Sequence, residues 1–552
     1  IQHGCCKGKM VKRIAMLIAI GAAVVGAAMM DDAPEAKPKQ AAAEEASASA
    51  FEWTTVVNNN DAMPGAPDGR TFNSYNQPSV NRDGLVVFRA RSRGGPPLGQ
   101  PTHGIYTRNM SYAGSPIVRI LDRTIPVPQP NNVLQQPDNR PTPFTETPSF
   151  PRIDMNSATV ATRGNHQPVW RYVPEGEPHK LARQRDFLTR AAPEAEDDET
   201  RAGTTGIYTN PFGVLVTGAA KLGAVPEFSF FEVPEYPGTT FEVFPGAPAI
   251  TGFNTIVFKG NYTTPAGGSR TGVYYRVLQD RSIGDDDLAP AGGDSPVVLV
   301  ASSDSTLIPG SSTVFGSTAP PSAAKGKVVF AGFDDEDNPT LGGIYQAPLQ
   351  PTPELTTLVS IGGQVPGESS ASTFNHLGEG GAFDGRFIGF WGAWGDETRT
   401  VRLYCATEGN RDRIAYCNQA LESAHTGEIL GDPGSVCDEE SDPYYGERCY
   451  QEREVPLNQG LFIHDNWHRI THVLAKTPGD FDDFLFWNFS GKTPCTGGGH
   501  HVEEGGEDDG EPARWRSSAF VAISGRRGPN VWGAFKARTG ELSEHNAYID
   551  PV

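Results

Sequence analysis

The stretch PSVNRDGLVVFRA, residues 78–90, joins a turn signal to an apolar run, and close variants of it recur along the chain. Asp83 and Gly84 suit a tight turn, and the LVVF that follows has the β-branched and aromatic character of a buried strand. After a loop the chain continues with Gly-Ile-Tyr at 104–106, which suits a second strand. Turn, strand, loop and Gly-Ile-Tyr therefore form one repeated unit.

Each copy of this repeat has a Phe, then in the clearest copies a Pro, a Gly- or Asn-centred turn, a β-branched run, a variable loop, and Gly-Ile-Tyr or a close variant. Another β-rich segment follows each Gly-Ile-Tyr, so the unit has four strands. Five clear copies begin at Phe72, Phe144, Phe241, Phe315 and Phe374, and a degenerate sixth covers 484–535. Many short strands separated by Gly and Pro turns favour a radial β architecture over a sandwich.

The sequence thus predicts an all-β fold, a β-propeller of six blades with four antiparallel strands each. The sixth unit stops after its third strand, whereas residues 51–65 resemble the fourth-strand segments of the other units. Pairing the two ends would close the ring and cover two sheet edges, so we expect an N-terminal closing strand. Seven blades are the alternative, if the insertion near 400–459 contains another one.

The pattern N-x-x-G-x-V-x-F, present at 81–88, and the later Gly-Ile-Tyr resemble secreted bacterial repeat proteins whose domains mostly have no assigned function. More distantly, the pattern is similar to the TolB-like propellers. The resemblance covers about residues 51–540 and implies a propeller fold. Its motifs are strand and turn signatures, so it implies no catalytic residue.

Residues 1–30 fit an export signal or an N-terminal anchor. Two cations precede an apolar run from Ile14 to Met30, with Gly26 and Ala28 at suitable cleavage positions. If the run is retained, residues 14–30 are the expected contact with a membrane. Residues 31–50 are rich in Ala, Glu, Pro and Lys and predict a flexible linker, and residues 541–552 predict a C-terminal tail. We expect a secreted or cell-envelope protein.

The charge of the chain limits its partners. Its 46 basic and 66 acidic residues give a formal net charge of −20, which repels phosphate backbones and so excludes nucleic acid as an expected partner. A glycan or an extracellular protein is the expected partner.

Four cysteines lie in the long insertion of the fifth unit, at Cys405, Cys417, Cys437 and Cys449. Equal spacing within each pair predicts disulfides 405–417 and 437–449, although four cysteines permit three pairings. A zinc site is the alternative, but the short C-x-x-C spacing is absent and export favours oxidation.

The units differ most in the loop between their second and third strands, with insertions at 163–205 and 391–459. In a four-stranded meander these loops share one edge with the connections to the next blade, so a binding face is expected there. Trp391 and Trp394 begin the longest insertion, where exposed indoles would stack on a sugar or a protein partner. Packing between blades is the alternative for both residues.

Metal binding has little support in the sequence, and we predict no metal site and no cofactor. His464, His468 and His472 would share one face of a helix, but alignment with the other units places them on a hairpin. Cys495 and the following histidines lie in a Gly-rich acidic segment. The acidic turns at 284–287 and 334–338 offer carboxylates for calcium, although neither is an EF-hand loop.

These observations favour an exported, non-enzymatic propeller that binds a ligand through its elaborated loops. No G-x-S-x-G nucleophile elbow is present in the sequence. An extracellular polysaccharide hydrolase or lyase, with carboxylates at the mouth of the channel, is the alternative from the enzyme class. A structural cell-surface protein is the third hypothesis.

Overall fold

The computed structural model describes most of the chain between residues 55 and 477 and five short strands beyond it. The described residues are 55–66, 69–76, 78–93, 101–132, 134–135, 140–166, 171–172, 200–201, 205–224, 226–280, 292–336, 338–405, 435–442, 446–477, 489–490, 516–517, 521–525, 531–535 and 547–549.

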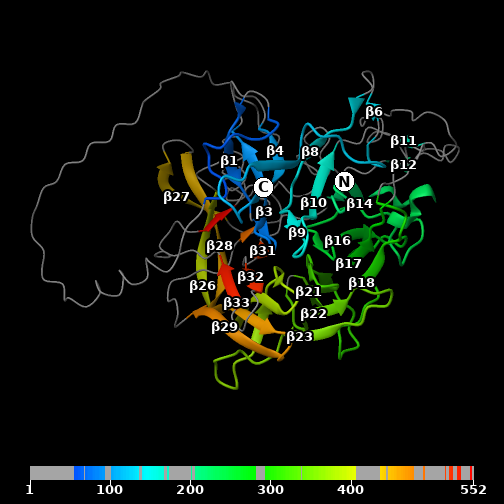
Figure 1. Cartoon of the computed structure of the whole chain (residues 1–552). Helices are drawn as coiled ribbons and strands as arrows, with labels where there is room; N and C mark the ends of the chain where they lie inside the picture. Colours follow the sequence, from blue (N-terminus) through cyan, green and yellow to red (C-terminus); the bar gives the residue numbers. More distant parts are fainter. Residues whose placement is uncertain are drawn as a thin grey trace, which may run out of the picture. The chain divides into compact units, whose positions relative to one another are not determined.

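The chain separates into two compact units, residues 1–58 and 59–552. In the first, only residues 55–58 are described, and they are not in a strand. In the second, five antiparallel sheets are arranged as the blades of a propeller and follow one another in chain order (Figure 1). The expected all-β propeller fold is confirmed.

Each blade has four main strands in meander order, as the repeat predicts. They are β1 (Phe72–Tyr75), β3 (Leu85–Ser92), β4 (His103–Asn109) and β5 (Ile117–Asp122) in blade 1; β8 (Phe144–Glu146), β10 (Val160–His166), β13 (Thr205–Thr209) and β14 (Val216–Ala220) in blade 2; β15 (Ala249–Thr251), β16 (Thr255–Thr263), β17 (Ser269–Val277) and β18 (Val298–Ser302) in blade 3; β19 (Ser317–Thr318), β21 (Lys327–Phe333), β22 (Gly342–Pro348) and β23 (Thr356–Ser360) in blade 4; and β24 (Phe374–Leu377), β26 (Phe387–Cys405), β28 (Gly446–Asp465) and β29 (Ile470–Thr477) in blade 5.

The first strand of four blades is broken, and a second short piece pairs with the same neighbour. These pieces are β2 (Ser79–Val80), β9 (Arg152–Ile153), β20 (Ser322–Ala324) and β25 (Ala382–Phe383). In blades 1, 2 and 4 the repeated proline, Pro78, Pro151 or Pro321, lies between the two pieces. A proline cannot donate a ladder hydrogen bond, so it is accommodated where the pairing is interrupted.

The turn that opens the quoted stretch is held by Asn81. Its side-chain oxygen accepts hydrogen bonds from the backbone nitrogens of Asp83 at 3.0 Å and Leu85 at 2.9 Å. Gly84 has a φ of 78°, a left-handed conformation that favours glycine. The predicted tight turn is confirmed, and the strand after it, β3, is largely buried.

The repeated Phe and the Tyr of Gly-Ile-Tyr are partners in the core. They meet edge to face in blades 1, 2 and 3, with centroid distances of 5.0 Å for Phe72 and Tyr106, 4.8 Å for Phe144 and Tyr208, and 4.9 Å for Phe241 and Tyr274. Blade 4 repeats this pair, and blade 5 replaces the Tyr with Phe462. The aromatic pair explains why the two motifs recur together, because each fills the space beside the other.

Small residues make room for these rings. A Cβ at Gly260 on β16 would lie 2.6 Å from the ring of Phe241, and one at Gly272 on β17 would lie 2.5 Å from the hydroxyl of Tyr274. Equivalent contacts occur around Gly164 and Gly206 in blade 2. The glycine of Gly-Ile-Tyr is therefore required for packing.

One buried cation links neighbouring blades 2 and 3. The Arg276 guanidinium on β17 donates to the carbonyl oxygens of Ser295 at 2.7 Å and Gly218 at 2.9 Å, and lies 4.9 Å from the centroid of the Phe231 ring. Burial lowers the pKa of Arg276 to about 9, so the group remains charged at neutral pH.

The meander places its connections on two opposite edges. We call the edge with the second-to-third-strand loops and the blade-to-blade connections the loop face, and the opposite edge the turn face. The described second-to-third-strand connections range from residues 264–268 in blade 3 to the long extension of blade 5. The variable connections thus share the loop face, as predicted from the topology.

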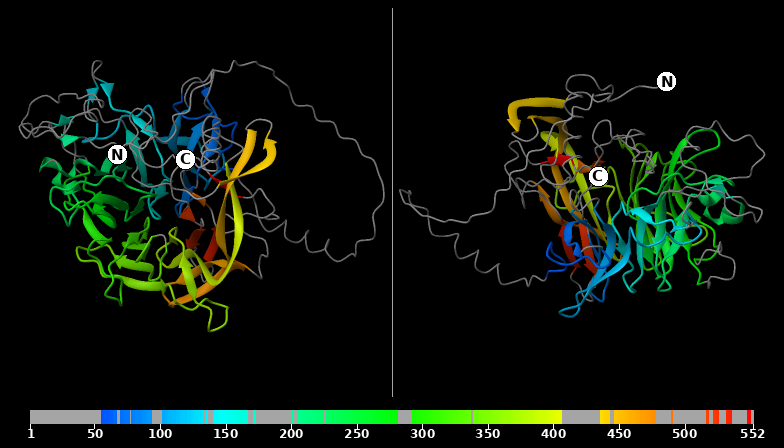
Figure 2. Two further views of the ribbon diagram at one scale, coloured as in Figure 1. Left: turned by 180° about the vertical axis from the view of Figure 1, so that it is seen from behind. Right: turned by 90° about the horizontal axis from the view of Figure 1, so that it is seen from above.

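The insertion at 391–459 differs from the expected loop. Strands β26 and β28 continue through it as a two-stranded ribbon, in register from Phe387↔Asp465 to Tyr404↔Tyr450, with an irregularity after Trp394. Figure 2 shows this ribbon, in yellow and orange, running past the other strands of its blade. β27 (Ser435–Asp442) pairs with its end. The pairing of β26 with β28 therefore runs across residues 391 and 459, the predicted ends of the insertion.

The predicted count of six or seven blades differs from the structure, which has five blades within the residues it describes. In the sixth repeat, the described pieces form only two-stranded pairs, β30 (Phe489–Ser490) with β31 (Arg516–Ser517) and β32 (Val521–Gly525) with β33 (Val531–Phe535). This repeat has a Phe at 484 but no Gly-Ile-Tyr like those of blades 1, 2 and 4. β34 (Ala547–Ile549), within the predicted tail, runs parallel to β26.

Several expectations fall on residues outside those described. The export signal, the linker and residues 51–54 of the expected closing strand are among them, and the described residues 55–57 lie outside the named strands. Only fragments of the insertion at 163–205 are described, including β11 (Arg171–Tyr172) and β12 (Thr200–Arg201). Within the described residues, no helix is long and apolar enough to span a membrane.

Candidate functional site

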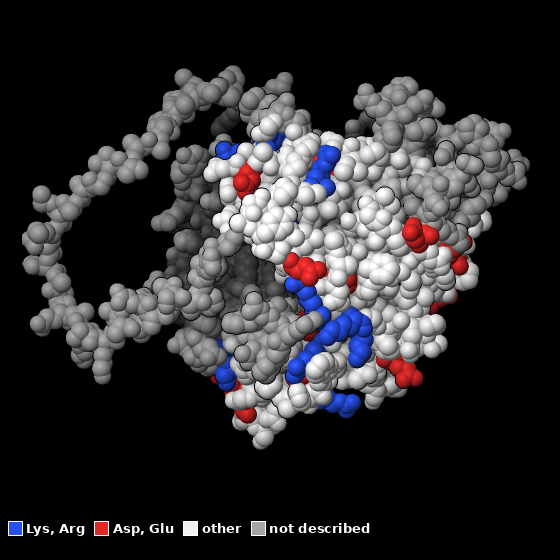
Figure 3. Space-filling model, viewed as in Figure 1, with Lys and Arg blue, Asp and Glu red and all other residues white. Residues whose placement is uncertain are grey.

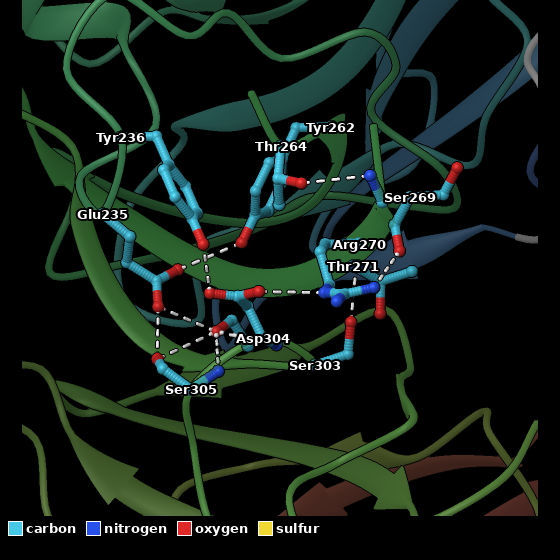
Figure 4. A network of polar contacts seen from close by, with 12 residues as sticks. Glu235, Tyr236, Tyr262, Thr264, Ser269, Arg270, Thr271, Ser303, Asp304 and Ser305 are labelled. Carbon is cyan, nitrogen blue, oxygen red and sulfur yellow. Dashed lines mark hydrogen bonds and ion pairs between the residues drawn. The ribbon is translucent and has the colours of Figure 1, made fainter. Parts of the chain in front are cut away.

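The loop face of blade 3 brings polar side chains together from three separate segments (Figure 4). Glu235 and Tyr236 follow the 3-10 helix η3 (Pro226–Phe231), Arg270 lies at the start of β17, and Asp304 follows β18. We call these residues, together with Tyr262 at the end of β16, the blade 3 cluster. The short turn at 264–268 is held by Thr264, whose hydroxyl oxygen accepts from the Gly268 nitrogen at 3.0 Å.

Asp304 is the centre of one half of the cluster. Its carboxylate accepts a hydrogen bond from the Tyr236 hydroxyl at 2.6 Å and another from Arg270 Nε at 2.9 Å. These hydrogen bonds, that from Tyr236 first, lower the pKa of Asp304 below its usual value, because both stabilise the ionised form. Asp304 is therefore ionised at neutral pH.

Glu235 is the centre of the other half. Its Oε2 accepts from the Tyr262 hydroxyl at 3.2 Å, and its Oε1 accepts from the Ser302 hydroxyl at 3.0 Å and from the Ser305 hydroxyl. The side chain of Glu235 is half-buried. Three hydroxyl donors from two strands and one loop thus fix the orientation of this carboxylate.

The tyrosines of this region are all held in the protonated form. Burial, followed by the charge of Glu235, raises the pKa of Tyr262, and burial raises the pKa of the neighbouring Tyr274. The hydrogen bond to Asp304 raises the pKa of Tyr236. Each tyrosine is therefore a hydrogen-bond donor at neutral pH and not a base.

The cluster combines fixed carboxylates, tyrosine hydroxyls and one guanidinium on a rigid scaffold. Glu235, Asp304 and Arg270 together carry one net negative charge when ionised. Fixed acceptors and donors of this kind bind ligands rich in hydroxyl groups. The pKa values of Tyr236 and Tyr262 are raised and that of Asp304 is lowered, so all three are shifted away from neutral pH.

The repeat could not identify this cluster, because its residues do not recur from blade to blade. Two short segments could have pointed to it: EYPG at 235–238 and SSDS at 302–305. Both fall in blade-to-blade connections, on the face where the units differ. The signal was their position after a strand, together with their polar composition.

Trp391 and Trp394, predicted as exposed binding residues, are not at the surface. Both side chains are buried, with 3% and 5% of their surface exposed. The Trp391 indole nitrogen donates to Gln459 Oε1 at 3.2 Å, and the Trp394 ring is 6.1 Å from that of Phe462. The indoles are part of the blade 5 core, because β26 continues through these positions as a paired strand.

The predicted cysteine pairs are only partly described. Cys437 on β27 and Cys449 on β28 are direct partners in the antiparallel register. Cys405 is the last residue of β26, and Cys417 lies outside the described residues. The disulfides themselves remain a prediction.

The three histidines of the fifth unit are on a hairpin, as the repeat predicts. His464 lies near the end of β28, His468 lies in the turn, and His472 is on β29. His464 Nδ1 is 3.0 Å from the Thr471 hydroxyl, and His468 Nδ1 is 2.7 Å from Asp465 Oδ2. Within the described part of the chain, no group of three or more His, Cys, Asp or Glu residues is arranged to hold a metal.

Of the two acidic turns that could offer carboxylates to calcium, the structure describes only that at 334–338, apart from residue 337. In the turn at 334–338, the Asp334 carboxylate accepts from the backbone nitrogens of Thr340 and Leu341, each at 2.9 Å, and so closes its own loop. Residues 284–287 and Cys495 with the histidines after it lie outside the described residues. Calcium binding stays untested.

Comparisons with known proteins give little further information. No family model and no curated protein matches the chain. Among solved structures, the polysaccharide lyase Uly1 is 9% identical, with a TM-score of 0.29, over 61% of this chain and 58% of that one. The tricorn protease is 10% identical, with a TM-score of 0.13, over 75% of this chain and 42% of that one. The chain thus spans less than two thirds of either protein, and the likeness is too low to carry an argument about the site.

Proposed function

We propose that this protein is a non-enzymatic β-propeller that binds a hydroxyl-rich ligand, such as a glycan, through the blade 3 cluster on its loop face. The observation that carries the proposal is the pair of oriented carboxylates, Glu235 and Asp304, with Arg270 beside them. A carboxylate held by protein donors keeps further lone pairs for ligand hydroxyls. The half-buried position of both residues leaves part of each accessible.

A polysaccharide hydrolase or lyase is the second candidate function, favoured by the carboxylates, Arg270 and tyrosines of the same cluster. Catalysis by a general acid or base is most effective when the pKa of the group is near the working pH. The pKa of Asp304 is lowered and that of Tyr262 is raised, so neither meets this condition. Binding is therefore the better supported function.

The test is a glycan array with the full chain, followed by titration of each hit. Glu235→Gln removes one carboxylate charge and should weaken binding about tenfold, since a hydrogen bond to a charged group contributes about 1.5–3 kcal/mol. Glu354→Gln is the matched control, because Glu354 is exposed and belongs to the connection between β22 and β23 on the turn face. Equal affinities of the two variants would count against the cluster, and release of new reducing ends would favour the enzyme.

The other parts of the proposal concern location and partners. We propose export through residues 1–30, with anchoring to a membrane if residues 14–30 are retained, and disulfides 405–417 and 437–449 in the insertion. The direct pairing of Cys437 and Cys449 in the strand register supports the second of these bridges. An extracellular protein is the alternative partner to a glycan, and a purely structural role at the cell surface is the alternative if no ligand binds.

A further inference from the structure

The turn face of blades 4 and 5 carries an exposed tryptophan in a fixed position. Trp467 lies in the turn between β28 and β29, and 67% of its surface is exposed. The Asp465 carboxylate accepts from the Trp467 backbone nitrogen at 3.0 Å, and the Asp465 carbonyl accepts from the Arg469 nitrogen at 2.7 Å. The turn is therefore ordered by its own hydrogen bonds, although the indole at its tip is exposed to solvent.

Arg386 fixes the indole from one side. Its guanidinium lies over two rings, 4.4 Å from the centroid of Phe387 and 4.5 Å from that of Trp467. The same guanidinium donates to both oxygens of Asp465, from Nε at 3.0 Å and from Nη2 at 2.5 Å. A bidentate pair of this kind restrains the planar group, so the stacked indole is restrained with it.

Lys325 brings a second cation to the indole from the neighbouring blade. It lies in the turn between β20 and β21 with a φ of 51°, and its ammonium is 5.9 Å from the centroid of the Trp467 ring. Its stem passes over Gly385, where a Cβ would lie 2.6 Å from Lys325 Cδ. Among the described residues, the Lys325 ammonium has no carboxylate partner.

The local charge differs in sign from that of the whole chain. The turns around Trp467 carry three basic residues, Lys325, Arg386 and Arg469, and two acidic ones, Asp384 and Asp465. These leave one net positive charge before His468 is counted, whereas the chain carries −20. On the face drawn in Figure 3, basic side chains gather over the region of strands β21 and β22 as Figure 1 labels them. A basic group on an acidic protein attracts anions locally.

We propose that Trp467, Arg386 and Lys325 form a second binding site, for a sugar ring that carries a carboxylate or a sulfate. The exposed indole stacks on the apolar face of the ring, and the Lys325 ammonium pairs with the anionic group. Because Arg386 already orients the indole, little conformational entropy is lost on binding. The site is on the opposite face from the blade 3 cluster and does not rest on the function proposed for that cluster.

An acidic peptide is the competing ligand class. Acidic peptide motifs are typically bound by clusters of arginine. Here the Arg386 guanidinium is already paired with both oxygens of Asp465. This site instead offers one flat ring and one ammonium that has no carboxylate partner among the described residues, which match a single charged sugar unit. A peptide would gain the charge contact but would leave the indole without a ring to stack on.

Titration of the full chain with acidic and neutral oligosaccharides tests the proposal. The probes are tetragalacturonate, a sulfated tetrasaccharide from heparin, and neutral cellotetraose, with a Glu-rich peptide as the competing class. Trp467→Ala should weaken binding of an acidic probe about tenfold or more, as expected for an exposed aromatic hot spot. Lys325→Gln should reduce the preference for the acidic over the neutral probe, and Lys325→Arg should restore it.

Tyr112→Ala is the matched control. Tyr112 is 57% exposed in the equivalent third-to-fourth-strand turn of blade 1. The Tyr112→Ala variant should bind each probe with the same affinity as the unmodified protein. Circular dichroism of each variant verifies folding, and Trp467→Phe, which keeps a ring, should lose less affinity than Trp467→Ala. Failure of both acidic saccharides to bind the unmodified protein, equal loss in Tyr112→Ala and Trp467→Ala, or tighter binding of the peptide would overturn the proposal.

Discussion

The glycine of Gly-Ile-Tyr offers a direct test of why the repeat exists. In blade 4 this residue is Gly343, paired with Ser360 across β22 and β23. A Cβ there would lie 2.1 Å from the carbonyl oxygen of Val359 and 2.9 Å from the Cα of Ser360, and both are backbone atoms. Ordinary contact begins at 3.4 Å, so Gly343→Ala requires the strands to move apart by more than 1 Å.

The cost of that movement can be estimated from packing. Inserting one carbon into a filled core typically costs about 1–3 kcal/mol, and here the obstacle is backbone, which has no alternative rotamer. We expect Gly343→Ala to lower the free energy of unfolding by about 3 kcal/mol. Gly381→Ala is the matched control, because the nearest atom to its Cβ is the Gly389 oxygen at 3.8 Å. Its free energy of unfolding should change by less than about 0.5 kcal/mol.

Urea unfolding of the full chain, followed by tryptophan fluorescence, measures this difference as a shift of the transition midpoint at constant slope. A midpoint for Gly343→Ala equal to that for Gly381→Ala would refute the packing argument. It would mean that Gly-Ile-Tyr recurs for some reason other than close approach of the neighbouring strand.

Three further predictions concern stability and cross-linking. Arg276→Met should lower the free energy of unfolding by about 3 kcal/mol in the same assay, because it leaves buried carbonyls unpaired, whereas exposed Arg469→Met should have little effect. Burial lowers the pKa of His166 to about 3, so as the pH falls the unfolded state takes up a proton on this ring at a higher pH than the folded state does. The free energy of unfolding therefore decreases as the pH falls below about 6.5. Relative to pH 7, the unmodified protein at pH 5 should lose about 2 kcal/mol more than His166→Gln, and equal losses would count against a buried neutral histidine. Mass spectrometry of a digest under non-reducing conditions should recover a peptide linked through Cys437 and Cys449, which free thiols at both positions would contradict.

The sequence was a good guide to the fold within one blade. The Phe, the Gly- or Asn-centred turn and Gly-Ile-Tyr are local signals, and each describes a contact inside one sheet, such as that between Phe144 and Tyr208. Repetition then implied radial packing, since a sheet that is apolar on both faces needs a neighbour on each side. The number of blades did not follow, because counting repeats does not show whether a degenerate copy, here the sixth, pairs as a full sheet.

The candidate site shows the opposite balance. The sequence determined that variable connections share one edge of the propeller, because strand direction alternates along every meander. Only the tertiary structure decided which side chains meet there: Glu235 and Asp304 are far apart in the chain, and their shared surroundings depend on how blade 3 packs. The same holds for Trp391, buried where a loop was expected, and for Trp467, whose cation partners come from two different turns. Periodic signals encode contacts between near neighbours in the chain, whereas a binding site is built from contacts between distant segments, which have no period.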